Sequence, residues 1–448
     1  MSSFKASTSP AALVKVGVAE EEAVRFVFNS EYEATASGTK YSGPYEAAAD
    51  AGAILFEGRR YDSIAFRPLS AEASFDLRDV VIGKSFHWER REDQRFRGEL
   101  HLVADGNRIA AINLIDLEDY LESVISSEMN AAAPTEFLRA HAVISRSWLL
   151  AQIAGNKPYA GPSSLITDGE LTRWYDREEH SLYDVCADDH CQRYQGITRA
   201  SANSRAIADI VRSTRGEVLM HNRQVCDARF YKCCGGITER FESVWEPVPH
   251  QYLQAVADAR LDGPLPDLSD EAAASAWIRS SPPAWCNTSD ADLLSRALNN
   301  YDSETTPGFY RWTVDYDAGE LSDIVRRRSG IDFGRILDLV PLSRGASGRI
   351  ERLQIVGTKL TYIIGKELEI RRSLSESHLF SSAFVVDKTT GPDGLPQRFG
   401  LTGAGWGHGV GLCQTGAAVM GERGLSYRQI LAHYYPGATI ESLPATGN

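Results

Sequence analysis

The chain has 448 residues, of which 43% are hydrophobic and 24% charged, and its formal net charge is −13. This composition is ordinary for a globular protein that buries a real core, and length alone suggests about three domains. The acidic balance argues against nucleic acid and anionic membrane surfaces as partners, because both require a basic protein surface. No run of about 18 apolar residues occurs, so we expect no membrane span, and the first residues lack the apolar core of a signal peptide.

The first quarter of the chain, residues 12–115, is predicted to form strands and turns, because its short apolar or alternating runs are broken by Gly, Asn and Asp. The sequence Asp-Gly-Asn at 105–107 lies between two apolar runs and indicates a hairpin. Helices are expected at about 116–129 and 135–153. The second is apolar nearly all round, which predicts a buried central helix.

The rest of the chain alternates between helical and extended patterns. Residues 157–196 are rich in loops, a helix is expected at about 198–214, and a strand pair should follow it. Residues 260–335 are polar and predicted to be helical, strands return from 349, and a helix and a final strand close the chain. The pattern predicts an α+β fold in two lobes with a cleft, strand-rich at both ends around a buried helical region.

Four segments follow from this pattern. We expect an N-terminal strand-rich part, a part with the catalytic helices and a metal loop, a polar helical insertion, and a C-terminal strand-rich part that completes the same domain as the first. Their boundaries are 12–115, 116–259, 260–335 and 336–441.

Glu128 is the first candidate for chemistry. Apolar residues at 117, 121, 124 and 125 mark one face of the first helix, and the next position on that face is Glu128. A carboxyl group on a buried face keeps its proton more readily than one in water, as a proton donor requires. A Glu at the helix end that turns to solvent or pairs with an Arg explains the same pattern equally well.

A second candidate is a cluster of metal-binding residue types. His180, Cys186, His190 and Cys191 supply two imidazoles and two thiols within a dozen residues, as a tetrahedral zinc site requires. Four protein ligands would fill the coordination shell, which favours a structural zinc over a catalytic one. The alternative is two buried cysteines beside unrelated histidines.

Two further stretches are unusual. Seven glycines lie between 400 and 416, without the spacing of a phosphate-binding loop, and suit close backbone approach to a ligand or a neighbouring strand. A helix should follow them, and His408 and Gln414 could face a cleft, although a tight structural turn explains the glycines equally well. The adjacent Cys233 and Cys234 precede a Gly-Gly turn and are best explained as buried thiols, because a disulfide between neighbours is strained.

Taken together, these stretches resemble the SpoIID family, including its amidase-enhancer relatives. The resemblance rests on "YLESVISSEMNAAAPTEFLRAHAVISRSWLLAQ", "DVCADDHCQRYQG", "FYKCCGGITE", "SESHLFSSAFVV" and "GWGHGVGLCQTGA", in the family's order. It implies a peptidoglycan lytic transglycosylase that cleaves between N-acetylmuramic acid and N-acetylglucosamine. The family's catalytic acid matches Glu128, its helix arginine matches Arg146, and the zinc of some members matches the loop cluster.

The resemblance also suggests residues that contact the glycan. These are Tyr231, Lys232, His408 and Gln414, although the stretch at 231–234 departs from the family's "F-x-S-x-x-G-G" pattern. Ordinary glycosidases need two carboxylates, and no second one is evident near Glu128 in the sequence. A lytic transglycosylase needs one, because the substrate's own C6 hydroxyl is the nucleophile. Arg146 lies in the buried helix, where we expect it to contact substrate or to position other groups indirectly.

Two other functions remain open at this point. A non-catalytic amidase enhancer would bind peptidoglycan or an amidase and cut nothing, and a zinc hydrolase would need an open metal position. Peptidoglycan glycan strands are the expected partner of the transglycosylase, and an amidase or peptidoglycan is the expected partner of the enhancer. The substrate implies the cell envelope, the periplasm or the exterior, although no export signal is visible.

Overall fold

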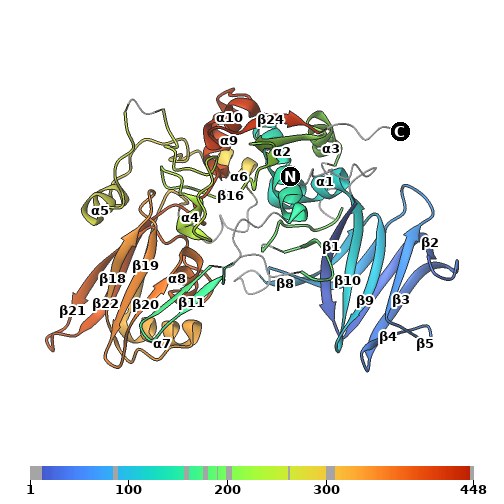
Figure 1. Ribbon diagram of the computed structural model, residues 1–448, viewed down its shortest axis with the longest axis horizontal. Coiled ribbons are helices and arrows are strands. Elements are labelled where there is room, and N and C mark those ends of the chain that lie inside the picture. Colours follow the sequence, from blue (N-terminus) through green and yellow to red (C-terminus); the bar gives the residue numbers. More distant parts are fainter. Residues whose placement is uncertain are drawn as a thin grey trace, which may run out of the picture.

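The computed structural model describes residues 13–83, 89–155, 161–174, 180–188, 190–197, 204–260, 263–298 and 308–443. Two β-rich lobes lie on either side of a helical centre (Figure 1). The fold is α+β, as the sequence predicted, with strands at both ends of the chain and helices between them. Within the described part of the chain, no helix combines the length and the apolar character that a membrane crossing needs.

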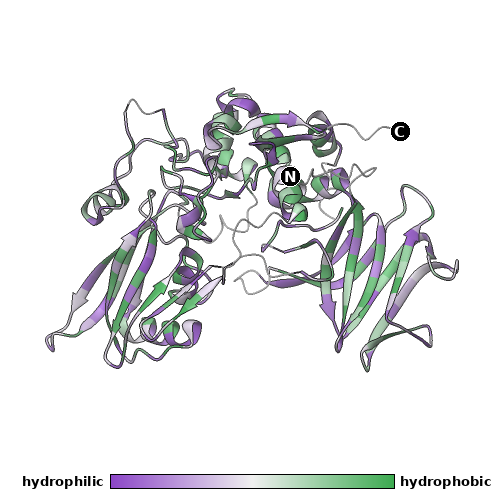
Figure 2. Ribbon diagram, viewed as in Figure 1, coloured by the Kyte–Doolittle hydropathy of each residue, from purple (hydrophilic) through white to green (hydrophobic). Residues whose placement is uncertain are grey.

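The N-terminal lobe is one 11-stranded sheet with the order β13-β1-β10-β9-β6-β2-β3-β4-β5, in which β7 pairs with β2 and β8. Hydrophobic and hydrophilic residues alternate along its strands (Figure 2), because successive side chains point to opposite faces. The expected hairpin joins β9 to β10, where Asp105 pairs with Arg108. The strands are β1 (Leu13–Glu21), β2 (Ala23–Ala34), β3 (Lys40–Asp50), β4 (Ala53–Phe56), β5 (Arg59–Tyr61), β6 (Ser63–Pro68), β7 (Phe75–Ile82), β8 (Arg90–Phe96), β9 (Glu99–Asp105), β10 (Arg108–Asp116) and β13 (Val185–Cys186).

The helical centre contains the two helices expected at 116–129 and 135–153. Asp116 caps α1 by accepting a hydrogen bond from the Glu118 N–H, and Gly155 ends α2 in the left-handed conformation. Buried residues surround α2, which confirms that it is a central core helix. The elements are α1 (Leu117–Glu128), α2 (Thr135–Ala154), α3 (Ser204–Ser213), α4 (Phe241–Val244), α9 (Gln414–Glu422), α10 (Tyr427–Tyr434), β14 (Glu217–His221), β15 (Gln224–Val225), β16 (Phe230–Tyr231), β23 (Leu412–Cys413) and β24 (Thr439–Ser442).

The second lobe holds two sheets, of order β11-β12-β20-β19-β18 and β17-β22-β21, with helices packed against them. It has its own hydrophobic core, which includes residues of β17, α7, β18 and β22. Its elements are β11 (Ser164–Ile166), β12 (Glu170–Arg173), α5 (Glu271–Arg279), β17 (Arg311–Asp317), α7 (Ala318–Ser329), β18 (Ile336–Arg344), β19 (Ile350–Gly357), β20 (Thr361–Gly365), α8 (Glu367–Ser373), β21 (Phe384–Thr390) and β22 (Pro396–Ala404). The helix α6 (Ala291–Ala297) instead packs against α9 of the helical centre.

Two parts of this lobe differ from the sequence-based expectation. The strand pattern from 349 ends at Gly365, and α8 replaces the expected continuation, because Glu and Arg favour a helix and Glu367 pairs with Arg371 one turn later. The polar stretch 260–335 contains three helices among its described residues, as expected, but also β17, which pairs along its length with β22.

The segment between α2 and α3 supplies strands to both lobes, β11 and β12 to the second and β13 to the first. β12 pairs in parallel with β20 of the second lobe, and β13 pairs in parallel with β1 of the first. This segment, which contains the His and Cys residues, therefore passes from one lobe to the other.

Candidate active site and metal centre

A cavity of about 1230 Å³ lies between the two lobes and below the helical centre, and we refer to it as the central cavity. Small-molecule pockets usually measure about 300–1000 Å³, so this space suits a larger, chain-like ligand. Its walls come from β1, the end of α1, the 180–193 loop, residues 229–232, α8 and the stretches 375–380 and 406–408.

Glu128 is the last residue of α1, and it lines the central cavity in a half-buried position. Its Oε1 atom accepts a hydrogen bond from the Arg193 N–H at 3.0 Å. The neighbouring Ser127 Oγ accepts one from the Gln195 N–H at 3.2 Å. The end of α1 is therefore held by the backbone that follows the metal loop, and Glu128 stands at the helix end, half-buried, at the wall of the cavity.

Arg146 lies away from the central cavity, with a fully buried side chain. Its guanidinium donates to both carboxylate oxygens of Glu118, at 3.0 and 2.7 Å, and to the backbone oxygen of Glu217 at 3.0 Å. Of the two roles considered for Arg146, this geometry favours indirect positioning, because the side chain ties α1, which ends in Glu128, to α2 and β14.

The four residues of the loop cluster come together. Their candidate ligand atoms all lie within 4.8 Å of one another. Cys191 Sγ is 3.5 Å from His180 Nε2 and 3.6 Å from His190 Nδ1, and Cys186 Sγ is 3.9 Å from His190 Nδ1. In a tetrahedral zinc site the ligand atoms are about 3.3–3.8 Å apart, from the usual zinc bond lengths. The spacing of the four residues therefore fits such an ion.

The electrostatics of this group also suit a metal. A hydrogen bond with Cys191, opposed by burial and helped by His180 and His190, holds the pKa of the Cys186 thiol well below its usual range. The thiolate is the form that binds zinc. With two imidazoles and two thiols, all four positions of a tetrahedral shell would be protein ligands, which leaves none for a catalytic water.

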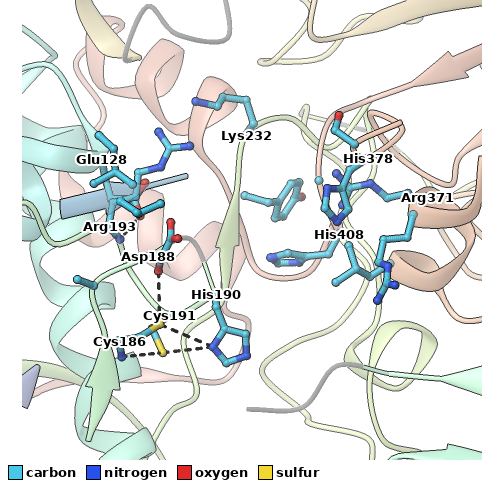
Figure 3. A pocket seen from close by; sticks show the side chains of 18 of the residues that line it. Glu128, Cys186, Asp188, His190, Cys191, Arg193, Lys232, Arg371, His378 and His408 are labelled. Atoms are coloured by element: carbon cyan, nitrogen blue, oxygen red, sulfur yellow. Dashed lines mark hydrogen bonds between the residues drawn. The ribbon is translucent and has the colours of Figure 1, made fainter. Parts of the chain in front are cut away.

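Three of the four residues expected to contact substrate lie on one wall of the cavity, and the metal loop lies on the opposite wall. Tyr231, Lys232 and His408 line the cavity, and Figure 3 shows Lys232 extending toward the side on which Glu128 lies. Gln414 also lines it, and its Nε2 lies 3.3 Å from His141 Nε2. The Tyr231 hydroxyl is buried without a hydrogen-bond partner among the described residues.

His408 is built into the wall by backbone contacts on both ring nitrogens. Its Nδ1 accepts from the Val410 N–H at 3.1 Å, and its Nε2 lies 3.0 Å from the Phe230 carbonyl oxygen, to which it donates. Burial, with help from the charges of Arg229 and Arg349, lowers the pKa of His408 well below its ordinary value. A neutral ring with both nitrogens occupied offers its face to a ligand rather than a proton.

Several cavity residues were not identified from the sequence as site residues. Arg371 and His378 lie opposite Glu128 (Figure 3), and Trp245 and Trp406 add aromatic surface. His378 and Trp406 lie in motifs that carry the family resemblance, which was the available signal, whereas Arg371 and Trp245 lie outside the stretches quoted for it. The Arg193 contact to Glu128 comes from the backbone, for which side-chain patterns give no signal.

Asp188 is a carboxylate that lines the central cavity in addition to Glu128. In Figure 3 its side chain lies on the same side of the cavity as Glu128, beside Arg193. It lines the central cavity, and its Oδ1 accepts from the Gly83 N–H at 3.3 Å. Asp188 is thus one of three acidic residues, with Glu20 and Asp105, that line the cavity besides Glu128.

The glycine-rich stretch packs against the segment that contains Lys232. β16 pairs in parallel with β23, and Cys233 forms a bridge with Trp406. Gly411 has a φ of +83°, and a Cβ there would lie 2.0 Å from the Arg229 carbonyl oxygen. Of the two explanations for these glycines, the structure supports close approach to a neighbouring strand, which forms the cavity wall.

Comparisons with known proteins bear on the whole site. The family model "Stage II sporulation protein" (SpoIID) matches residues 105–221, and "Domain of unknown function (DUF8618)" matches residues 239–411. Stage II sporulation protein D of Bacillus subtilis is 25% identical over 339 residues, which cover 75% of this chain and 77% of that protein. The protein of the same name from Bacillus amyloliquefaciens is 26% identical over 74% of this chain and 75% of its own length.

A further relative is the amidase enhancer of Bacillus subtilis, 23% identical over 72% of this chain but only 40% of that protein. The SpoIID match covers Glu128, Arg146 and the loop cluster. These similarities confirm the resemblance found in the sequence motifs: the chain carries a SpoIID family domain.

Proposed function

We propose that this protein is a peptidoglycan lytic transglycosylase and that Glu128 is its general acid and base. The observation that carries the proposal is the position of Glu128, a carboxyl group fixed by the Arg193 N–H at the edge of a cavity large enough for a glycan chain. The names of the related sporulation proteins and of the amidase enhancer are consistent with a role at the cell wall.

The reaction needs one group that first gives and then takes a proton. Protonated Glu128 donates its proton to the glycosidic oxygen as the bond from that oxygen to the muramyl C1 breaks. The C6 hydroxyl of the same muramyl residue then attacks C1, and the carboxylate of Glu128 takes the hydroxyl proton. The products are a 1,6-anhydro-muramyl end and a free hydroxyl on the leaving sugar, and no water is consumed.

The remaining cavity residues suit the substrate's other groups. Muramic acid has a lactyl carboxyl group, which is anionic unless a peptide is attached, and Lys232 is a cation on the wall facing Glu128. The rings of Tyr231, Trp245 and His408 pack together, with centroids 5.2 Å apart between Tyr231 and His408 and 4.8 Å apart between Trp245 and His408. Such aromatic surface suits the apolar faces of sugar rings, with Gln414 as a hydrogen-bonding group beside it.

In this proposal the loop zinc would have a structural role and would take no part in the reaction. His180, Cys186, His190 and Cys191 would hold the ion, and its chemistry there is to cross-link the loop. Arg193 lies two residues after Cys191, so a loop fixed at Cys191 also fixes the N–H that orients Glu128. Loss of the loop zinc should therefore lower both the rate of glycan cleavage and the thermal stability of the protein.

The decisive test is mass spectrometry of glycan strands, with and without stem peptides, after incubation with the purified protein. The wild-type protein should release 1,6-anhydro-muramyl ends, and Glu128→Gln should release none. Glu122→Gln is the matched control, because Glu122 is a half-buried carboxylate of the same helix that does not line the cavity. Reducing muramyl ends instead of anhydro ends would refute the transglycosylase and indicate a hydrolase.

The competing proposal is a non-catalytic enhancer that binds an amidase or peptidoglycan. It is favoured by the similarity to the protein named amidase enhancer, of which this chain spans 40%. The same experiment separates the two, because an enhancer releases no glycan products alone but increases peptide release by an added cell-wall amidase, and Glu128→Gln leaves that increase unchanged.

A further inference from the structure

A second group of metal-binding side chains lies in the core behind the cavity wall. Cys234, Asp258, Cys286 and Cys413 place three thiols and a carboxylate within 4.8 Å of one another. All four residues are buried, with exposed fractions of 2% or less. They come from four segments far apart in the sequence, and they are distinct from the loop cluster.

The distances in this group are those of a compact coordination shell. The Sγ atoms of Cys234 and Cys286 are 3.4 Å apart, whereas two thiolates on one tetrahedral zinc are about 3.8 Å apart. No disulfide joins any of the seven cysteines, all of which are described. The group is thus close to a tetrahedral S₃O arrangement without a covalent bond between its members.

Backbone N–H groups point at two of the three sulfur atoms. The Gly236 N–H donates to Cys234 Sγ at 3.3 Å, and the N–H groups of Cys234 and Gly416 donate to Cys413 Sγ at 3.3 and 3.4 Å. Backbone donors aimed at sulfur are the outer-shell contacts expected around metal thiolates. Cys413 is also the N-cap of α9, where the helix dipole favours an anion.

Asp258 is anchored in the same way. Its Oδ2 accepts from the Cys286 N–H at 2.7 Å, and its Oδ1 accepts from the Tyr434 hydroxyl. A Cβ at Gly416 would lie 2.3 Å from Asp258 Oδ1, so α9 can approach the carboxylate only with glycine at that position. A buried carboxylate beside three thiols is costly unless a cation compensates its charge.

We propose that Cys234, Asp258, Cys286 and Cys413 bind a second, structural zinc ion. Three soft thiolates and one carboxylate select zinc over magnesium or calcium, and four protein ligands leave no open position for a reaction. The ion would join the segment that contains Tyr231 and Lys232, the segments at 258 and 286, and the start of α9, which contains Gln414. It would thereby fix one wall of the central cavity, whatever reaction takes place there.

The test is metal content and cobalt spectroscopy of the full chain, purified under reducing conditions and reloaded with Zn²⁺ or Co²⁺ alone. A chain with the loop cluster removed (His180→Ala, Cys186→Ser) should still hold one zinc per chain. With Co²⁺, it should show a near-ultraviolet thiolate-to-cobalt band. Adding Cys286→Ser or Cys413→Ser should abolish both signals, and Asp258→Asn should weaken binding of either metal.

Cys226→Ser is the matched control, because Cys226 is an equally buried thiol outside the group, and it should change neither signal. A loop-depleted chain that unfolds cooperatively, binds no zinc and gives no cobalt band overturns the proposal without any substitution of Cys234, Asp258, Cys286 or Cys413. So does a disulfide between Cys234 and Cys286, identified in a non-reducing digest as a cross-linked peptide about 2 Da lighter than its two reduced halves together. None of these outcomes depends on glycan cleavage.

Discussion

The substitution Arg146→Met tests whether Arg146 contacts the substrate directly or positions the helix that ends in Glu128. The methionine keeps most of the aliphatic stem but removes the guanidinium, which pairs with Glu118 through two hydrogen bonds and holds the Glu217 carbonyl. Glu118 would then keep its charge at the edge of the core without a partner. We expect the protein to lose stability, and Glu128 to lose the exact placement of its helix.

The expected loss is large. Removing one partner of a buried ion pair costs about 3–5 kcal/mol, because the remaining charge is desolvated and uncompensated. Glu118 is not fully enclosed, since 18% of its side chain is exposed. Water can therefore relieve part of the penalty, and we expect about 3 kcal/mol, the lower end of that range.

Urea unfolding of wild type, Arg146→Met, Glu118→Gln and the double variant gives the coupling between the two residues. The coupling should account for most of the Arg146 effect. In glycan assays, a positioning residue should lower kcat more than it raises KM. A loss below about 1 kcal/mol together with a raised KM and an unchanged kcat would refute the positioning role and restore direct substrate contact.

Three further outcomes follow from the described contacts. Gly424→Ala should cost about 1–2 kcal/mol in urea unfolding, because its φ of +82° is left-handed but its surroundings are open. Gly411→Ala should cost clearly more, because its Cβ would also meet the Arg229 carbonyl oxygen at 2.0 Å; equal losses would contradict the close approach. Burial, with the charge of Lys232, lowers the pKa of His141 from 6.5 to about 3, so its contribution to stability is complete above pH 6.5 and is lost as pH falls toward 3. That loss amounts to about 2 kcal/mol at pH 5, and a pH series of unfolding curves should be flatter for His141→Gln. Asp188→Asn should leave the 1,6-anhydro product unchanged if Glu128 acts alone, whereas loss of all glycan products would assign Asp188 a part in the chemistry.

The sequence predicted the parts of the site that depend on local pattern. The apolar face of α1 led to Glu128 because helix periodicity fixes which residues share a face, and the loop cluster followed from the density of His and Cys alone. The buried α2 and the hairpin at 105–107 were predicted for similar reasons. Each of these features is determined within about 20 neighbouring residues.

The parts that the sequence did not reveal depend on contacts between distant segments. Arg146 pairs with Glu118, 28 residues away, and no local pattern distinguishes that partner from a substrate carboxylate. The strand β17 lies in a polar stretch and is recognisable only beside β22. Cys286 and Cys413 are isolated cysteines in the sequence, and only the fold brings them to Cys234 and Asp258.

The two groups of metal-binding residues have a common relation to the cavity. The loop cluster lies on the side of Glu128, where the chain crosses from one lobe to the other, and it is linked to that carboxylate through Arg193. The Cys234 group lies behind the opposite wall, next in sequence to Tyr231 and Lys232. Irregular backbone forms much of both walls, and irregular backbone has few regular hydrogen bonds to hold it in place. Cross-links through metal ions would give these walls the rigidity that helices and sheets provide elsewhere. A proton donor needs such rigidity, because small displacements from the reacting bond are costly in rate.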